Sequence, residues 1–266
     1  MKTRIFFMSG TGNSLWIAKR IASQIGGEVK LTALQSIKEK TVVDAQRIGF
    51  LLPVYFADIP DFAKKAIRLL EFTSCTYAFG IVNFGSIGGN ALTHLKTEIE
   101  NIGVRFNAGF SIVMPDNSIV FSSSEKTKRN IFLQIDNKIH TIAEQIISGK
   151  ENASTFKTKF NMTLLKFVTR VGLLSFYGAN KKSATDTCTG CGLCVQFCPV
   201  QNISIKNKMP LFANKCVQCF GCAQWCPTRS IRYGRCVIND KTQYTHPEIT
   251  AKELSAFNKH KDLIGM

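Results

Sequence analysis

The sequence is poor in acidic residues and offers no run of apolar residues long enough to suit a membrane. It has 18 Asp and Glu against 34 Lys and Arg, so its formal charge is +16. The excess is spread evenly, without a polybasic block or a nucleic-acid-binding module, and we therefore expect no nucleic-acid partner. A basic surface of this kind favours encounter with an acidic partner protein.

Two apolar stretches invite a membrane interpretation, and neither supports it. The run at 5–8 is too short for a signal peptide. Lys166 and Arg170 interrupt the stretch at 162–177 well before the roughly 20 apolar residues that a span requires. Its spacing predicts a docking helix with one apolar face. We therefore expect a cytoplasmic protein without a membrane span.

Cysteine is the one unusually concentrated residue type. The chain has 10 cysteines, and in a protein expected in the cytoplasm they favour metal or redox use over a disulfide framework. The spacing C-x2-C-x2-C-x3-C-P occurs twice, with the second copy 28 positions after the first. The correspondence extends beyond the cysteines, since Ile203 matches Ile231. This segment is therefore an internal duplication.

The duplicated spacing is typical of paired [4Fe–4S] clusters. Three thiolates of one copy wrap three corners of a cluster, and the Cys-Pro cysteine of the other copy completes it. Zinc sites typically use two separated C-x2-C pairs, which a doubled run of three cysteines matches poorly. The predicted ligands are Cys188, Cys191, Cys194 and Cys226 for the first cluster, and Cys216, Cys219, Cys222 and Cys198 for the second.

The first half of the chain alternates between β-rich runs and segments of helical period. This alternation predicts an α/β fold with a doubly wound parallel sheet, in the flavodoxin-like arrangement of five strands. The predicted strands are 4–8, 28–31, 47–54, 77–83 and 105–113. The predicted helices are 14–25, 60–72, 90–101 and 126–148, the last with a row of isoleucines that includes Ile146 and Ile147.

A glycine-containing loop joins the first predicted strand to the first predicted helix. Its glycines let the backbone curl, and the helix N-terminus behind it favours an anion. No Lys follows, so the loop is not a P-loop. Neutral donors suit a monophosphate ester, which is how FMN is held; a tight turn with Ser14 capping the helix is the alternative. The loop consists of Ser9, Gly10, Thr11, Gly12, Asn13 and Ser14.

Two further loops follow predicted strands at the same edge of the sheet, where ligands of such folds bind. One offers aromatic faces for stacking, and the other has glycines that permit close approach to a flat ring. Together they predict the site of a flavin ring, although either aromatic could instead belong to the core. The candidate residues are Pro53, Val54, Tyr55 and Phe56 in the first loop, and Asn83, Phe84, Gly85, Gly88, Gly89 and Asn90 in the second.

These motifs carry a resemblance. The first half resembles a flavodoxin and the second half a bacterial two-cluster ferredoxin. The whole chain resembles the fused flavodoxin–ferredoxin proteins of the EFR-type ferredoxin family, and the match extends to the segments 114–117, 232–234 and 244–247. The expected division is a flavodoxin-like domain at 1–150, a linker and docking helix at 151–186, a small ferredoxin-type two-cluster domain at 187–237, and a tail at 238–266.

The resemblance implies a protein with two [4Fe–4S] clusters and FMN that relays electrons between them and onward to a redox protein partner. Two alternatives stay open: a flavin-dependent reductase of a small organic acceptor, and a ferredoxin whose flavodoxin-like half is an FMN-free docking domain. No catalytic residue is predicted. The four histidines lack a neighbouring nucleophile or carboxylate motif, and we expect them at the surface.

Overall fold

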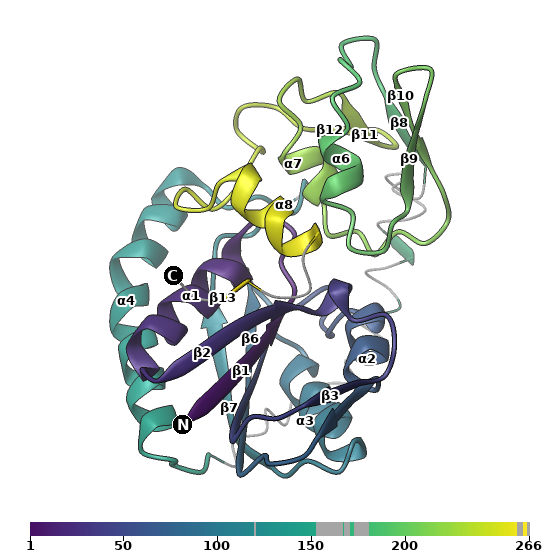
Figure 1. Ribbon diagram of the computed structural model, residues 1–266. Coiled ribbons are helices and arrows are strands. Elements are labelled where there is room, and N and C mark those ends of the chain that lie inside the picture. The colour runs from purple at the N-terminus through teal and green to yellow at the C-terminus, as the bar shows by residue number, and fades with distance from the viewer. Residues whose placement is uncertain (120, 153–166, 168–170, 173–180, 260–262, 265–266) are drawn as a thin grey trace.

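A six-stranded sheet forms the centre of the first half of the chain, and a loop-rich unit of small elements lies against one end of it (Figure 1). The structure is a computed structural model that describes all residues except 120, 153–166, 168–170, 173–180, 260–262 and 265–266. The predicted docking helix at 162–177 falls almost wholly outside the described residues. Within the described part of the chain, no helix has the length and apolar character needed to cross a membrane.

The central sheet has the strand order β13-β2-β1-β4-β6-β7. Its five parallel strands are thus ordered 2-1-3-4-5 along the sheet, which is the flavodoxin-like arrangement and confirms the predicted fold class. Every residue of the central strand β4 is buried, as a parallel strand covered on both faces requires. The strands are β1 (Lys2–Phe7), β2 (Glu28–Ala33), β4 (Arg47–Pro53), β6 (Tyr77–Phe84), β7 (Phe106–Val113) and the antiparallel edge strand β13 (Leu263–Ile264).

Helices cover both faces of the sheet. On one face α1 (Asn13–Ile25) packs beside α4 (Glu125–Ile147), and on the other α2 (Asp61–Ile67) packs beside α3 (Ala91–Asn101). The short 3-10 helix η1 (Leu34–Ser36) follows β2. Each of these helices follows a strand in the chain, and the loops that connect strand to helix lie at the carboxyl edge of the sheet. In folds of this kind, the loops at that edge form the ligand site.

The helix predicted at 60–72 is wrong in its second half. Helix α2 ends at Ile67, and β5 (Leu70–Phe72) then pairs in parallel with β3 (Thr41–Val43), a strand that the sequence did not reveal. Leu70 is buried in the core beneath this pair. The backbone pairing of β5 with β3, together with the burial of Leu70, therefore outweighs the local helical pattern.

The small unit repeats one structural motif twice. Helix α6 (Leu193–Gln196) leads to β9 (Ile203–Lys206), and 28 positions later α7 (Gly221–Gln224) leads to β11 (Ile231–Tyr233). The sequence duplication is therefore also a duplication of elements. β9 pairs with β10 (Met209–Phe212), while β11 lies between β8 (Lys182–Ala184) and β12 (Cys236–Val237). Helix α8 (Ala251–Lys259) contacts β2, η1 and α6, and so bridges the two halves.

Adjacent isoleucines at the end of α4 give a matched test of this packing. The side chain of Ile146 is fully buried, whereas Ile147 is 52% exposed, although both belong to the predicted row. We expect Ile146→Ala to lower the free energy of unfolding by about 2–5 kcal/mol, and Ile147→Ala by no more than about 0.5 kcal/mol. Apparent midpoints of thermal unfolding, recorded anaerobically at one scan rate, compare them; equal losses would contradict the packing of α4.

Candidate functional site

The eight cysteines of the duplicated pattern surround two neighbouring cavities of the small unit. All ten cysteines are free thiols. The first cavity is lined by Cys188, Cys191, Cys194 and Cys226, and also by Cys222, which the two cavities share. The second cavity is lined by Cys198, Cys216, Cys219 and Cys222. Each cavity thus receives three thiols from one copy and a fourth from the Cys-Pro cysteine of the other.

The two cavities differ in their surroundings. Cys191 of the first cavity is exposed, whereas Cys219 of the second cavity is buried and packs in the hydrophobic core on one face of the sheet. Burial raises the pKa of Cys222 to about 12 and that of Cys194 to about 11. Buried thiols of this kind are poor free nucleophiles, and a bound metal would hold them as thiolates.

Backbone conformation shapes the two cysteine loops. Gly190 and Gly192 have φ angles of 70° and 77°, which glycine adopts freely. The positions 28 residues later repeat this geometry with side chains, since Gln218 and Phe220 have φ angles of 56° and 57°. Such angles are costly for residues other than glycine, and they occur where the surrounding structure enforces them, often at functional sites.

The loop from Ser9 to Ser14 forms an anion-binding turn in front of α1. Gly12 is the N-cap with φ 102°, and no side chain caps the helix, because the Ser14 hydroxyl instead donates to Asn83 Oδ1 at 2.7 Å. The backbone amides of Thr11, Asn13 and Ser14 have no hydrogen-bond partner among the described residues. They surround a cavity of about 60 Å³, room for a single small anion.

The side chains of this loop are already used to hold its shape. The Ser9 hydroxyl accepts from Gly12 N at 3.1 Å, and Asn117 Nδ2 donates to the Thr11 hydroxyl at 3.0 Å. Asn13 Nδ2 donates to the Pro115 carbonyl at 3.1 Å. The anion donors are therefore the free amides and the remaining hydroxyl hydrogens. Segment 114–117, which contributed to the family resemblance, lines the same cavity.

The structure brings together most of the predicted flavin-binding residues, but not all. All four residues of the first aromatic loop line a cavity at this edge of the sheet, and Asn83, Phe84 and Gly85 line the anion cavity with three of them. Gly88, Gly89 and Asn90 line neither cavity. Gly89 and Asn90 pack against the turn at Ala57 instead, where a side chain on Gly89 would lie 2.2 Å from the Ala57 carbonyl oxygen, and Gly88 packs against the Phe84 ring.

A larger groove of about 600 Å³ opens beyond Tyr55, between the first half and the cysteine unit. Tyr55 and Phe56 line one wall, and residues 213–218 line the other. Cys216 lines both this groove and the second cysteine cavity. Lysines also line it, namely Lys65, Lys182 and Lys215. A molecule in the groove would thus lie beside Cys216, which belongs to the second set of thiols.

One buried polar atom beside the groove lacks a partner. Gln218 is a buried residue that lines the groove, and its Oε1 atom has no hydrogen-bond donor among the described residues. Leaving a buried acceptor unpaired costs about 1–3 kcal/mol. A hydrogen-bond donor that reached this atom would remove this cost.

Two glycines allow the halves to meet backbone to backbone. A side chain on Gly10 would lie 2.8 Å from the Cys219 carbonyl oxygen, and one on Gly221 would lie 2.9 Å from the Gly10 carbonyl oxygen. Trp225 Nε1 donates to that same Gly10 carbonyl at 3.0 Å. The anion loop therefore rests directly on the loop that carries the second set of thiols.

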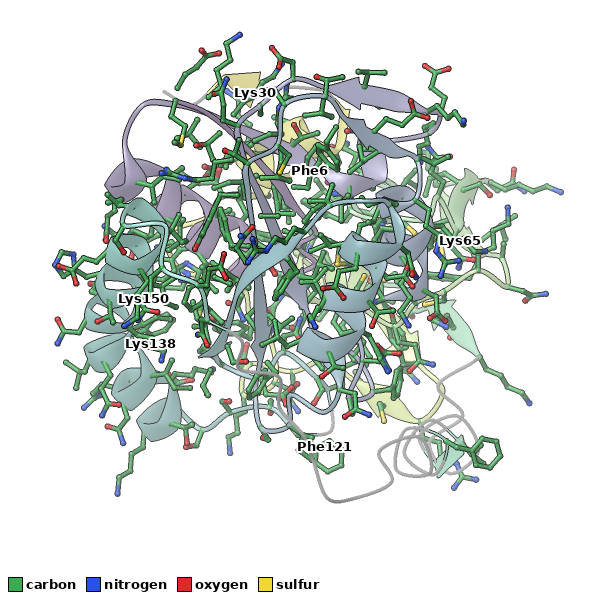
Figure 2. All side chains as sticks on the ribbon, turned by 90° about the horizontal axis from the view of Figure 1, so that it is seen from below. Phe6, Lys30, Lys65, Phe121, Lys138 and Lys150 are labelled. Atoms are coloured by element: carbon green, nitrogen blue, oxygen red, sulfur yellow. The ribbon has the colours of Figure 1, made fainter. Side chains whose placement is uncertain are left out.

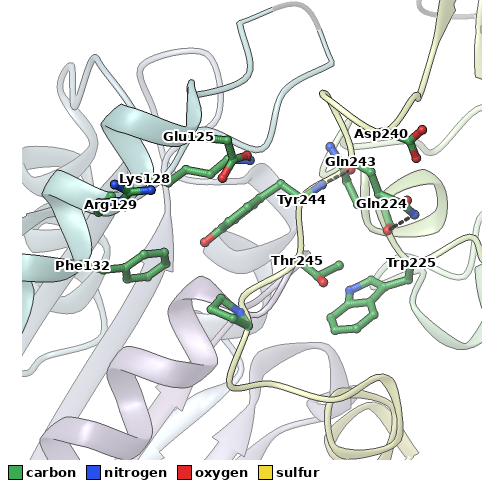
Figure 3. A pocket seen from close by; sticks show the side chains of 11 residues that line it. Glu125, Lys128, Arg129, Phe132, Gln224, Trp225, Asp240, Gln243, Tyr244 and Thr245 are labelled. Carbon is green, nitrogen blue, oxygen red and sulfur yellow. Dashed lines mark hydrogen bonds and ion pairs between the residues drawn. The ribbon is translucent and has the colours of Figure 1, made fainter.

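The segment after β12 fastens this contact from the other side (Figure 3). The Tyr244 hydroxyl donates to Asn13 Oδ1 at 2.7 Å, and His246 N donates to the Thr11 carbonyl at 2.8 Å. An open groove of about 610 Å³ lies here between α4 and the cysteine unit, with Lys128 above the Tyr244 ring. Gln224 and Gln243 hold the chain here, where dashed lines mark the bonds from Gln243 Nε2 to the Gln224 carbonyl and from Tyr244 N to Gln224 Oε1.

One histidine departs from the expected surface position, and another lies beside a carboxylate. His246 is 1% exposed and stacks on Trp16 with ring centroids 4.6 Å apart. Burial lowers its pKa to about 4, so it is neutral at pH 7. His94 lies 2.6 Å from the buried Asp58 carboxylate, which also binds Lys64. No spacing within the sequence points to either contact, because the partners are distant along the chain; the resemblance over 244–247 was the one available signal.

Comparison with known proteins agrees with the cysteine geometry. Residues 180–227 match the family model described as a 4Fe-4S dicluster domain, which contains all eight cysteines of the pattern. This segment is therefore a dicluster domain that holds two [4Fe–4S] clusters, and the protein takes part in electron transfer. No curated protein matches the chain.

Several solved structures are similar to part of the chain. A flavodoxin of Streptococcus pneumoniae matches at 16% identity and TM-score 0.40, covering 56% of this chain and 99% of its own. A Megasphaera elsdenii flavodoxin matches at 17% and 0.35, covering 53% and 98%. Rubredoxin oxygen:oxidoreductase of Desulfovibrio gigas matches at 15% and 0.36, where 56% of this chain spans 36% of that one. The fold class itself rests on the observed strand order.

Proposed function

We propose that this protein is an electron carrier in which two [4Fe–4S] clusters exchange electrons with FMN and with a redox protein partner. The cluster ligands are those predicted from the spacing, and the grouping of the eight thiols around two cavities supports them. The observation that carries the proposal is the position of Cys216, which lines both the second cluster cavity and the groove beside Tyr55.

FMN fits the residues present at this edge of the sheet. The free amides of Thr11, Asn13 and Ser14 are donors for its phosphate, and the small cavity admits that group alone. The groove beyond Tyr55 has a volume in the range of small-molecule sites, and Gln218, whose acceptor is buried and unpaired, is among its lining residues. FMN would supply two-electron chemistry to a chain whose clusters pass single electrons.

The FMN-free docking domain is the second candidate. The tightness of the anion loop favours it, since the loop side chains are paired within the protein and two segments of the second half cover the loop. In that case the ferredoxin-type segment alone would carry electrons. Direct measurement of FMN binding separates the two candidates.

Anaerobically reconstituted protein should contain about eight iron atoms per chain, as two [4Fe–4S] clusters require, and FMN close to one per chain. Gln218→Met removes the unpaired acceptor. We expect it to stabilise the FMN-free protein by about 1 kcal/mol and to weaken FMN binding about fivefold. Equilibrium dialysis and thermal unfolding measure the two effects, which have opposite signs.

Gln24→Met is the matched control, because Gln24 Oε1 is another buried acceptor without a partner among the described residues, located on α1 outside both cavities. It should raise stability and leave FMN affinity unchanged. Full iron content without any FMN binding would select the FMN-free candidate, and equal FMN affinity in wild type and Gln218→Met would refute the role of Gln218.

The crossed ligand assignment predicts which cluster suffers when a Cys-Pro cysteine is changed. Cys198→Ser should perturb the cluster of Cys216, Cys219 and Cys222, although Cys198 follows the other triad in sequence. EPR of the reduced protein, compared with Cys191→Ser, shows which signal is affected. If both variants alter the same signal, the assignment is wrong.

The outer cluster is where we place the redox partner. Residues 187–237 contain six Lys and Arg and no Asp or Glu. Ile205 lines the first cysteine cavity and is 40% exposed, and Lys206 follows it at the surface. The backbone of Lys208 packs against Gly190 of the first cysteine loop. An exposed apolar contact beside the cluster, flanked by cations, fits an acidic redox protein.

Charge reversal tests this docking face. Lys206→Glu with Lys208→Glu should slow association with a small acidic [2Fe–2S] ferredoxin by on the order of tenfold at low ionic strength, and the difference should shrink with salt. The control is Lys138→Glu with Lys150→Glu, two lysines labelled together on the α4 side of the molecule (Figure 2). Stopped-flow electron transfer and binding titration provide the readouts. Equal effects of the two pairs, or faster reaction with a basic cytochrome c, would refute it.

A further inference from the structure

The two cluster cavities are related by the internal repeat, and comparison of equivalent positions exposes one difference in chemistry. Offset by 28 positions, Ile203 and Ile205 of β9 correspond to Ile231 and Tyr233 of β11. Ile205 lines the first cavity and Tyr233 lines the second. The repeat thus places an exposed isoleucine beside the outer thiols and a fully buried tyrosine beside the inner ones.

The Tyr233 hydroxyl lies 3.2 Å from Cys222 Sγ, within hydrogen-bond distance. Sulfur bound to iron has no hydrogen, so the tyrosine must then be the donor. Cys222 belongs to the inner set of thiols, and Tyr233 is 1% exposed. No water competes for this hydroxyl. Ile205, in the equivalent place, has nothing to donate.

The other hydrogen bonds to sulfur are largely shared by the two copies. Asn202 N donates to Cys198 Sγ at 3.1 Å, and the equivalent Ser230 N donates to Cys226 Sγ at 3.3 Å. Gln218 N adds a bond of 3.3 Å to the inner set. At the outer set the Thr228 hydroxyl lies 3.6 Å from Cys226 Sγ, but Thr228 is exposed and its hydroxyl also contacts Ser230 Oγ at 2.6 Å.

The Tyr233 ring is fixed in place. It occupies the central strand of its sheet, packs against Phe220 with ring centroids 4.9 Å apart, and lies beneath Lys182 at 5.0 Å. Phe220 has the left-handed backbone that glycine adopts in the first copy. These contacts hold the hydroxyl beside Cys222, where it would contribute to the electrostatics of the cluster.

We infer that the Tyr233 hydroxyl selectively raises the reduction potential of the inner cluster. The inference rests on the proposed cluster ligation. Reduction adds negative charge that the sulfurs share, and a donor to sulfur stabilises the reduced state more than the oxidised one. Water provides such donors at the exposed outer cluster. Burial withholds water from the inner cluster, and Tyr233 supplies a donor in its place.

Tyr233→Phe removes the hydroxyl and keeps the ring. Redox titration of the anaerobic holoprotein, followed by EPR, should show one cluster shifted to a more negative potential and the other unchanged. The shifted signal should be the one that Cys198→Ser perturbs. Tyr244→Phe is the matched control, because it also removes a buried tyrosine hydroxyl, one bonded to Asn13 and not to sulfur; it should leave both potentials unchanged.

The outcomes separate this inference from the proposed function. Iron content and the visible spectrum of each variant establish that both clusters are present before any potential is compared. Protein without clusters would defeat the proposed function itself. Two intact clusters with unshifted potentials in Tyr233→Phe would overturn the inference alone, as would a shift of the outer cluster or an equal shift in Tyr244→Phe.

Discussion

The close approach of two backbones, at Gly10 on one side and Cys219 to Gly221 on the other, holds the two halves of this protein in their functional arrangement. A side chain at either glycine would collide with the opposing main chain. Without this approach, Trp225 could not reach the Gly10 carbonyl, and Cys216 would not border the groove beside Tyr55. The anion loop lies against the loop of the inner thiols because Gly10 and Gly221 have no side chains that would keep the two backbones apart.

A direction through the molecule follows from this arrangement. The outer set includes the exposed Cys191, the inner set includes the buried Cys219 and Cys222, and Cys216 of the inner set also lines the groove. From the exposed side inward, the two cysteine cavities and the groove therefore follow one another. The basic surface near Ile205 stands at one end of this path, and the aromatic wall of Tyr55 and Phe56 stands at the other.

The features predicted correctly from the sequence are those written in local spacing. The parallel strands follow from apolar runs, and the dicluster segment follows from eight cysteines at fixed intervals. Helix 60–72 was extended too far, because pairing of β5 with β3 depends on residues nearly 30 positions away. The burial of His246 and the contact of Tyr244 with Asn13 join residues more than 200 positions apart, and no periodicity records such contacts.

The duplication of the cysteine unit has one further consequence. Its two copies still share a backbone, including left-handed residues at equivalent positions, but the first copy keeps glycines where the second carries Gln218 and Phe220. Those side chains face the groove and Tyr233. The two copies thus still share the path of the main chain, but they differ in the side chains that it carries. One copy is suited to a position toward solvent and the other to a position toward the sheet. The two copies could therefore no longer exchange positions.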